Sequence, residues 1–231
     1  MKIKKKIKSK MIPHGPRSRL PSHQEFSWDT ITIGPNDKSR YRVTKQLLKT
    51  DNHFFYLASH PSHGEVVIKQ WQHKHAYDAI PGIRYLFAFN GMKHSLKVYD
   101  VWGVNVAMEK LEGTMDELNI DKEMYSCFSQ LLTAVRDVHY KKIALFNIEP
   151  KNIGWTLNDF GERVYKFFDY NKALSFTTAT TLDKNPMDDI VALGHIFATF
   201  DSDFIREIAT ECLSGKFTAS QLYKKWVDDI V

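Results

Sequence analysis

The sequence predicts an α+β fold in which a small β-rich part precedes a helical part. Three short runs of β-prone residues lie within residues 39–69 and are separated by polar turn residues. Helical periodicity takes over after residue 115 and is strongest in residues 124–139, where apolar residues recur every three or four positions. With 231 residues, 43% of them hydrophobic, the chain can bury a full core, so we expect one compact, two-lobed domain.

The first 25 residues predict a flexible basic arm. Six of the first ten residues are lysines and none is acidic, and residues 11–25 contain Pro13, Gly15, Pro16 and Pro21 without apolar periodicity. A lysine run of this kind suits a nucleic acid, an anionic surface or a nuclear-import receptor. A run that only aids solubility would have the same composition. The lysine run is therefore open to two interpretations: nucleic acid binding through residues 1–10, or a charged segment that only aids solubility.

The β-rich part is expected to form a five-stranded sheet with one helix. Alternating apolar and β-branched residues predict strands at residues 39–48, 53–58, 65–69, 96–101 and 104–110. The stretch 76–90, between the third and fourth strands, predicts a helix. Further along the chain, a short hairpin separates Ile153 from Phe167, and a helix is expected to begin at Asp189.

Several classes of protein are disfavoured by what the sequence lacks. Cys127 and Cys212 are far apart and form no C-x-x-C pair, so we expect neither a disulfide framework nor a structural zinc site. His73 and His75 have no further ligand at a recognisable spacing. No apolar run is long enough to span a bilayer and no secretory signal is evident, so we expect an intracellular protein, cytoplasmic or nuclear.

The most informative feature is a set of four short segments in a fixed order. They are Val66-Val67-Ile68-Lys69, Ile148-Glu149-Pro150-Lys151-Asn152-Ile153, Phe167-Phe168-Asp169-Tyr170-Asn171 and Asp189-Ile190-Val191-Ala192-Leu193-Gly194. Their order and spacing resemble those of the protein kinase superfamily, from about residue 40 to the C-terminus. The resemblance implies a two-lobed protein-kinase-like fold, with an N-lobe at about 26–111 and a trimmed helical C-lobe at about 112–231.

The resemblance also implies roles for single residues. Lys69 stands where the family has the strand lysine that binds the α- and β-phosphates of ATP. Met108-Glu109-Lys110-Leu111 resembles the gatekeeper and hinge, so Met108, Glu109 and Leu111 would meet the adenine.

Three further positions match the family's metal ligands and its buried helix aspartate. Asn152 and Asp169 would hold the metal ions that accompany the nucleotide. Asp189 resembles the aspartate that ties the catalytic loop to the helix behind it.

The chain differs from the family at two positions of the segment that resembles the catalytic loop. Asn147 occupies the position of the catalytic base, and an amide cannot accept a proton from a substrate hydroxyl as a carboxylate does. Glu149 stands where Ser/Thr kinases of the family usually carry a lysine, so its charge would oppose the negative charge that develops during transfer.

Other parts of the family's apparatus are also altered. Alignment with the glycine-rich loop places Leu48, Thr50 and His53 at the three glycine positions, where side chains would crowd the phosphates. The only acidic residue between Gln70 and Tyr99 is Asp78, which lies too early in the chain to serve as the partner of Lys69. The segment 170–188 is short and lacks the motif that ends a substrate platform.

These observations favour a pseudokinase that binds no ATP and Mg²⁺, or binds them weakly, and that acts through another protein, such as a kinase or a kinase substrate. Two alternatives stay open. One is an unorthodox kinase with weak transfer through Lys69, Asn152 and Asp169, and the other is a nucleic-acid-associated protein that uses its basic arm. The compact chain and its many departures suggest a viral or similarly fast-evolving kinase mimic.

Overall fold

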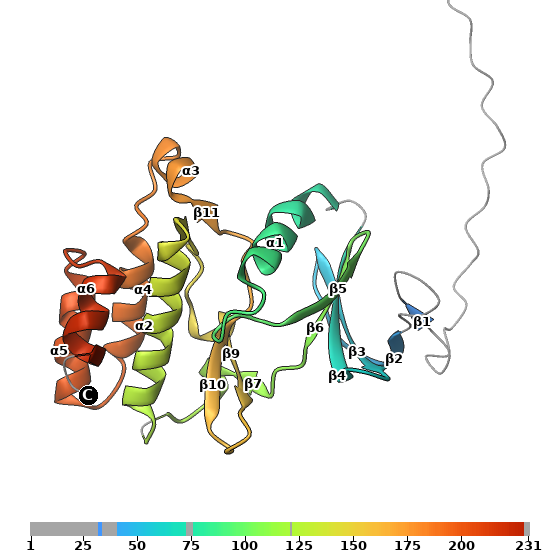
Figure 1. The fold of residues 1–231 in the computed structure, drawn as a ribbon, viewed down its shortest axis with the longest axis horizontal. Coiled ribbons are helices and arrows are strands. Elements are labelled where there is room, and N and C mark those ends of the chain that lie inside the picture. The colour runs from blue at the N-terminus through green and yellow to red at the C-terminus, as the bar shows by residue number, and fades with distance from the viewer. Residues whose placement is uncertain (1–31, 34–40, 73–75, 121, 229–231) are drawn as a thin grey trace, which may run out of the picture.

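The protein has a mixed α+β fold, seen in a computed structural model that describes residues 32–33, 41–72, 76–120 and 122–228 (Figure 1). For residues 32–33 and 76–80 only the backbone is described. The predicted arm at residues 1–25 lies outside the described residues. A β-sheet with one helix forms the first part of the fold, and helices with two smaller sheets form the second.

The main sheet has six strands, and each hydrogen-bonded pair within it is antiparallel. In their order across the sheet, these are β1 (Thr32–Ile33), β2 (Tyr41–Lys49), β3 (His53–His60), β4 (Gly64–Trp71), β6 (Asn105–Glu109) and β5 (Val98–Trp102). The five predicted strands are confirmed, with ends within two residues of those expected. The two-residue strand β1 was not predicted.

Alternation along β4 divides the sheet into two faces, because successive side chains of a strand point in opposite directions. Val67 and Trp71 belong to the large core between the sheet and the rest of the fold. Val66 and Ile68 are fully buried in a separate cluster on the other face. Lys69 therefore faces the large core, together with Val67 and Trp71.

Helix α1 (Ala76–Phe89) connects β4 to β5, where the sequence predicted a helix at 76–90. Phe89 is fully buried and its ring lies 5.0 Å from that of Tyr170, a residue of the second part of the fold. The helix thus packs between the main sheet and the segment that follows Phe167.

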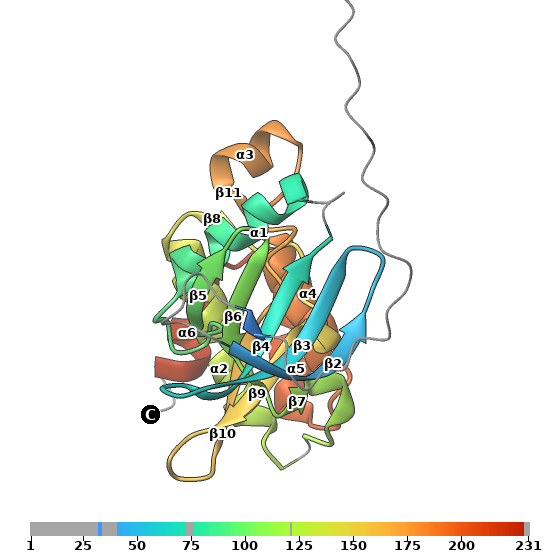
Figure 2. The same cartoon turned by 90° about the vertical axis from the view of Figure 1, so that its right-hand side faces the viewer.

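The second part contains two small sheets. One has the order β10 (Arg163–Phe167), β9 (Ile153–Leu157) and β7 (Gly113–Thr114), and the other pairs β11 (Leu174–Ser175) with β8 (Ile143–Ala144). Strands β9 and β10 form the hairpin expected between Ile153 and Phe167, and it projects from the body (Figures 1 and 2). Two short 3₁₀ helices lie between strands of the three-stranded sheet in the chain: η3 (Met115–Glu117) follows β7, and η4 (Pro150–Asn152) precedes β9.

Helices make up the remainder of the described chain. They are α2 (Met124–Tyr140), α3 (Phe176–Thr181), α4 (Asp188–Phe197), α5 (Asp203–Leu213), α6 (Ala219–Tyr223) and the π-helical turn η5 (Lys224–Asp228). Helix α2 matches the predicted helix at 124–139, and seven of its residues are buried. The helix expected from Asp189 is α4, which begins one residue earlier.

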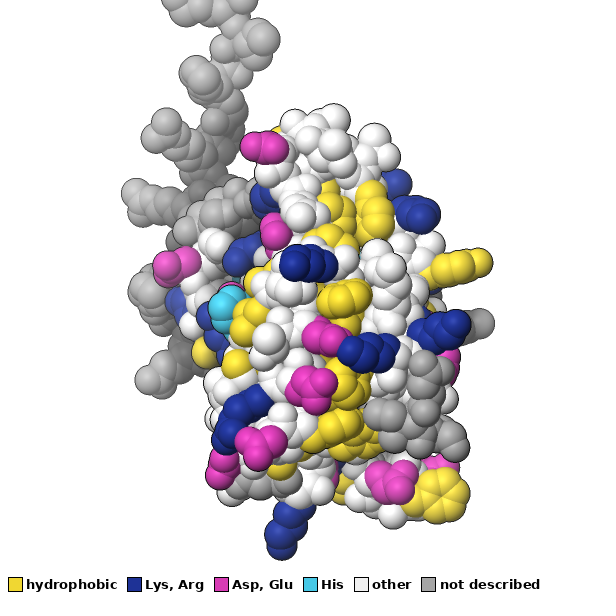
Figure 3. Space-filling view, turned by 90° about the vertical axis from the view of Figure 1, so that its left-hand side faces the viewer, with side chains coloured by type: hydrophobic (Ala, Val, Ile, Leu, Met, Phe, Trp, Pro, Cys, Tyr) yellow, Lys and Arg dark blue, Asp and Glu magenta, His cyan; other side chains and the backbone are white. Residues whose placement is uncertain are grey.

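The outer surface of the helical part carries a band of hydrophobic side chains bordered by charged ones (Figure 3). Phe204 and Leu213 of α5 are 39% and 38% exposed.

Both cysteines are free and buried, Cys127 in α2 and Cys212 in α5. Burial raises the pKa of each thiol to about 12. No helix within the described ranges is long and apolar enough to cross a bilayer.

Candidate functional site

The loop between β8 and η4 is held at its inner end by the carboxylate of Asp189. That carboxylate is 1% exposed, and it accepts hydrogen bonds from the backbone N–H groups of Leu145 and Phe146, each at 2.7 Å. The Nε2 atom of His139 lies 3.0 Å from it. Phe146 has a positive φ of 55°, a conformation that costs energy for a residue other than glycine. The expected tie between Asp189 and this loop is confirmed.

Asn147 lies at the outer end of the same loop and joins two other predicted site residues. Its side-chain amide donates to Oδ2 of Asp169 at 3.0 Å, and its backbone carbonyl accepts from the amide of Asn152 at 3.1 Å. The β9–β10 hairpin brings Asp169 to this loop, because Ile153 pairs with Phe167 at the hairpin's open end. Asn147, Asn152 and Asp169 therefore form one cluster.

Lys69 approaches this cluster from the main sheet. Its Nζ atom lies 4.0 Å from Oδ1 of Asp169, and the side chains of the pair are 10% and 24% exposed. The ammonium group also lies over the rings of Trp71 and Phe55, at 4.8 and 5.7 Å from their centroids. Burial lowers the pKa of Lys69 from its usual value, and the charge of Asp169 offsets part of that change.

Gly82 of helix α1 lies close to the segment that follows Asp169. A Cβ atom at Gly82 would stand 2.6 Å from Oδ1 of Asn171, so a larger residue in the helix would require the Asn171 side chain to move. Residues 81–89 of the helix contain no acidic residue. The side chain of Asp78 lies outside the described residues. Within the described chain, Asp169 is the carboxylate that pairs with Lys69.

The residues expected to meet adenine have contacts within the protein. Both carboxylate oxygens of Glu109 lie 2.7 Å from Nζ of Lys166 on β10, and these two side chains are 14% and 13% exposed. Met108 is buried in the large core. Leu111 packs on β9, since a Cβ atom at Gly154 would stand 2.3 Å from its Cδ1 atom. Glu109, the last residue of β6, and Leu111, two residues beyond it, thus join this part of the chain to the β9–β10 sheet.

The positions aligned with the glycine-rich loop lie at and beside a short, hydrogen-bonded turn. Strand β2 ends at Lys49 and β3 begins at His53, so only three residues connect them. The hydroxyl of Thr50 accepts from the backbone N–H of His53 at 2.9 Å, and Gln72 donates to the Thr50 carbonyl at 3.0 Å. The ring of His53 meets that of Trp71 edge-on at 5.3 Å. Leu48, by contrast, is 53% exposed.

Glu149 lies at the surface and has a local partner. Its carboxylate is 2.6 Å from Nζ of Lys151, and the two side chains are 42% and 66% exposed. The hydrogen bond from Lys151 lowers the pKa of Glu149. The negative charge that sequence comparison placed at this position is therefore balanced by the residue two positions further along.

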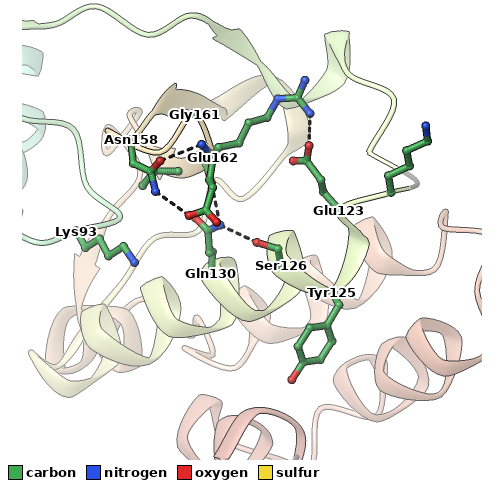
Figure 4. Close-up of a pocket in the computed structure, with 11 residues that line it drawn as sticks. Lys93, Glu123, Tyr125, Ser126, Gln130, Asn158, Gly161 and Glu162 are labelled. Carbon is green, nitrogen blue, oxygen red and sulfur yellow. Dashed lines mark hydrogen bonds and ion pairs between the residues drawn. The ribbon is translucent and has the colours of Figure 1, made fainter. Parts of the chain in front are cut away.

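A polar cavity of about 460 Å³ lies elsewhere, between the start of α2 and the β9–β10 hairpin (Figure 4). Inside it, Arg163 pairs with Glu123 at 2.9 Å, and the amide of Asn158 donates to Glu162 at 2.9 Å. Gln130 donates to the Ser126 hydroxyl at 3.0 Å. None of the predicted site residues lines this cavity.

The described residues contain no group of three or more histidine, cysteine, aspartate or glutamate side chains placed to hold a metal ion. One carboxylate, Asp169, and one amide oxygen, that of Asn152, are the ligands that the cluster offers. Mg²⁺ is commonly held by one or two carboxylates together with substrate phosphates, so this pair fits Mg²⁺ only in the company of a nucleotide.

Three residues of the site were missed in the sequence. Trp71 belongs to no motif, although its position two residues after Lys69 places both on one face of a strand. Lys166 and Gly82 act through partners 57 and 89 positions away, Glu109 and Asn171. No local pattern indicates such pairs.

No known family model matches this chain, and no curated protein matches it either.

Proposed function

We propose that this chain is a catalytically impaired, two-lobed, protein-kinase-like protein that acts by binding another protein. The observation that carries the proposal is the cluster itself. Lys69, Asn147, Asn152 and Asp169 come from separate elements, and they meet as the kinase resemblance implies. The contact of Asp189 with the 145–147 loop adds a fifth matching position.

The arrangement of the elements supports the same proposal. An antiparallel sheet with one helix precedes a mainly helical part, and Lys69 on the sheet faces Asp169 on the second part. That is the order and the facing of the N-lobe and C-lobe that the resemblance implies.

The contacts of the cluster argue against efficient phosphate transfer. Asn147 uses its amide N–H to hold Asp169, and an amide has no basic site for a hydroxyl proton. Losing a positioned general base commonly lowers the rate by about 10² to 10⁴. Lys69 has a lowered pKa and is engaged by Asp169, Trp71 and Phe55, so binding phosphates would require these contacts to be exchanged.

Calorimetric titration with ATP, with and without Mg²⁺, tests the nucleotide part of the proposal. We expect a dissociation constant weaker than about 100 μM, which at millimolar ATP would stabilise the fold by little more than about 1.4 kcal/mol. The matched control is Lys69→Met, which removes the ammonium group from the site. A dissociation constant in the low micromolar range that Lys69→Met weakens would contradict the expectation.

A weakly active kinase is the second candidate, and the retained pair of Asn152 and Asp169 favours it. These two would hold Mg²⁺ with the nucleotide phosphates, which the ion would screen during transfer. Kinases usually turn over at about 1–100 s⁻¹, and we expect this chain to be at least about 10⁴-fold slower. The test is labelled-phosphate incorporation by purified protein. Robust labelling that Asp169→Ala abolishes would establish the second candidate in place of the first.

Partner binding should then be independent of the nucleotide site. We expect Lys69→Met to leave the set of captured proteins unchanged, as long as thermal melts show that the variant is folded. Loss of capture in this folded variant would mean that the nucleotide site takes part in binding.

A further inference from the structure

A second cavity, of about 440 Å³, is open to solvent and has an apolar wall. It lies between the η3 segment, the start of η4 and the C-terminal end of α4. Met115, Ile120, Ile196 and Phe200 line it and are each at most 8% exposed. Polar side chains at its rim include Asp116, which is exposed. A solvent-open cavity lined by buried apolar and exposed polar side chains suits a short peptide segment that carries both kinds of side chain.

The segments that supply the lining of this cavity are rich in acidic residues in the sequence. Within three positions of the lining residues, the sequence contains eight acidic residues and two lysines. One of those lysines, Lys151, is paired with Glu149. Asp201, next to Phe200, shares Arg206 with Asp203. Asp116 forms no ion pair with another described residue.

The opposite charge is concentrated at the start of the same chain. Residues 1–40 contain ten lysine and arginine residues and three acidic ones, which gives a formal charge of +7. Residues 41–231 contain 22 basic and 24 acidic residues, which gives −2. The net +5 of the chain therefore conceals a basic N-terminal segment and a body that is slightly acidic, with acidic residues frequent in the segments that line this cavity.

Residues 1–10 match this cavity in apolar content as well as in charge. Ile3 and Ile7 lie four positions apart among six lysines. The 21 residues from 11 to 31 connect this segment to β1 and can span about 70 Å when extended. A folded domain of this size is about 45 Å across, so the segment can reach any face of the body.

We propose that residues 1–10 dock in the cavity formed by η3, η4 and the end of α4. Ile3 and Ile7 would contact its apolar wall, and the lysines would lie against the acidic rim. The proposal goes beyond the proposed function and does not depend on the kinase resemblance. Its consequence is that the lysine run is covered in the free protein, so an anionic partner must compete with the protein's own cavity.

The test uses a fluorescent peptide of residues 1–12 and the full-length chain with all six arm lysines changed to glutamine. Because that chain has lost its own basic segment, its cavity is free to take the peptide. We expect binding at low salt, and at least threefold weaker binding to the unmodified chain, whose own arm competes. Adding Asp116→Lys and Asp201→Lys to the glutamine chain should weaken binding about tenfold, since attraction becomes repulsion at one lining position and at the exposed neighbour of the lining residue Phe200.

Two controls separate docking from general attraction between charges. Asp51→Lys and Asp159→Lys make the same charge change at exposed turns that do not line the cavity, and binding should stay within twofold. A peptide with Ile3→Ser and Ile7→Ser keeps every lysine but loses its apolar contacts, so it should bind at least tenfold more weakly.

Thermal melts confirm that each variant is folded. Equal losses in the two pairs of aspartate variants, equal binding of the serine peptide, or no binding at all would each overturn the proposal. Equal binding to the unmodified and glutamine chains would overturn docking within one molecule.

Discussion

Three carboxylates lie at or near the loop between β8 and η4, and their surroundings differ between its inner end, near Leu145, and its outer end, near Asn147. Asp189, at the inner end, is 1% exposed and contacts three donors. Asp169, at the outer end, is 24% exposed and lies between Lys69 and Asn147. Glu149 is 42% exposed and pairs with Lys151. The contacts at the inner end are buried and hold the loop in place, whereas those at the outer end are partly exposed and could be replaced by contacts with a ligand.

The largest effect should come from the inner end. Asp189→Ala leaves the N–H groups of Leu145 and Phe146 without their acceptor, and an unsatisfied buried group costs about 1–3 kcal/mol. We expect the free energy of unfolding to fall by about 3 kcal/mol or more in urea titrations. Asp188→Ala is the matched control, because Asp188 is the exposed neighbour on the same helix. Similar losses in the two variants would contradict the comparison.

The outer end should respond less, and in a way that depends on which partner is removed. Asp169→Ala leaves the ammonium group of Lys69 buried without a counter-charge, so we expect a loss of about 2 kcal/mol. Lys69→Met removes that charge and should cost less. The double variant should be no less stable than Asp169→Ala alone. Additive losses in a double-mutant cycle would mean that the two residues do not interact.

The lowered pKa of Lys69 predicts a pH dependence of the stability at the outer end of the loop. In the folded state Lys69 loses its proton at a lower pH than in the unfolded chain, so the unfolded chain binds more protons between the two pKa values. Stability of the wild type relative to Lys69→Met should therefore rise as pH increases toward 10.5. Urea titrations at pH 8, 9 and 10 measure this difference, and a constant difference would contradict the pKa shift.

The smallest effect should be at Glu149. The carboxylate and its partner Lys151 are both largely exposed, and pairs of this kind add little to stability. We expect Glu149→Gln to leave the melting temperature unchanged within error, at both low and high salt. A clear loss would show that Glu149 has a contact beyond Lys151.

The strands and helices of the fold could be predicted because local patterns specify them. Residues 41–71 alternate as half-buried strands do, and residues 124–140 have the spacing of a helix with one buried face. Strand β1 was missed because it is two residues long and its pairing with Tyr41 and Arg42 involves only the backbone. A pairing of that length leaves no period in the sequence.

The candidate site was predictable in its members but not in its contacts. Lys69, Asn147, Asn152 and Asp169 were singled out because the order and spacing of their segments resemble those of the protein kinase superfamily. The pairing of Glu109 with Lys166 was not, because two side chains 57 positions apart leave no local signal. The approach of Gly82 to Asn171 was missed for a related reason, since a glycine indicates that space is limited without naming the neighbour that limits it.

Chemical modification of the two buried thiols can measure local unfolding of the helices that carry them. With pKa values raised to about 12, Cys127 and Cys212 carry almost no thiolate at neutral pH and are shielded from alkylating reagents. Each can react only when its helix, α2 or α5, separates from the core. The rate of modification at each thiol therefore reports how often that helix is released. A cysteine introduced at an exposed position, such as Phe160 on the β9–β10 turn, could be labelled selectively while Cys127 and Cys212 stay in place.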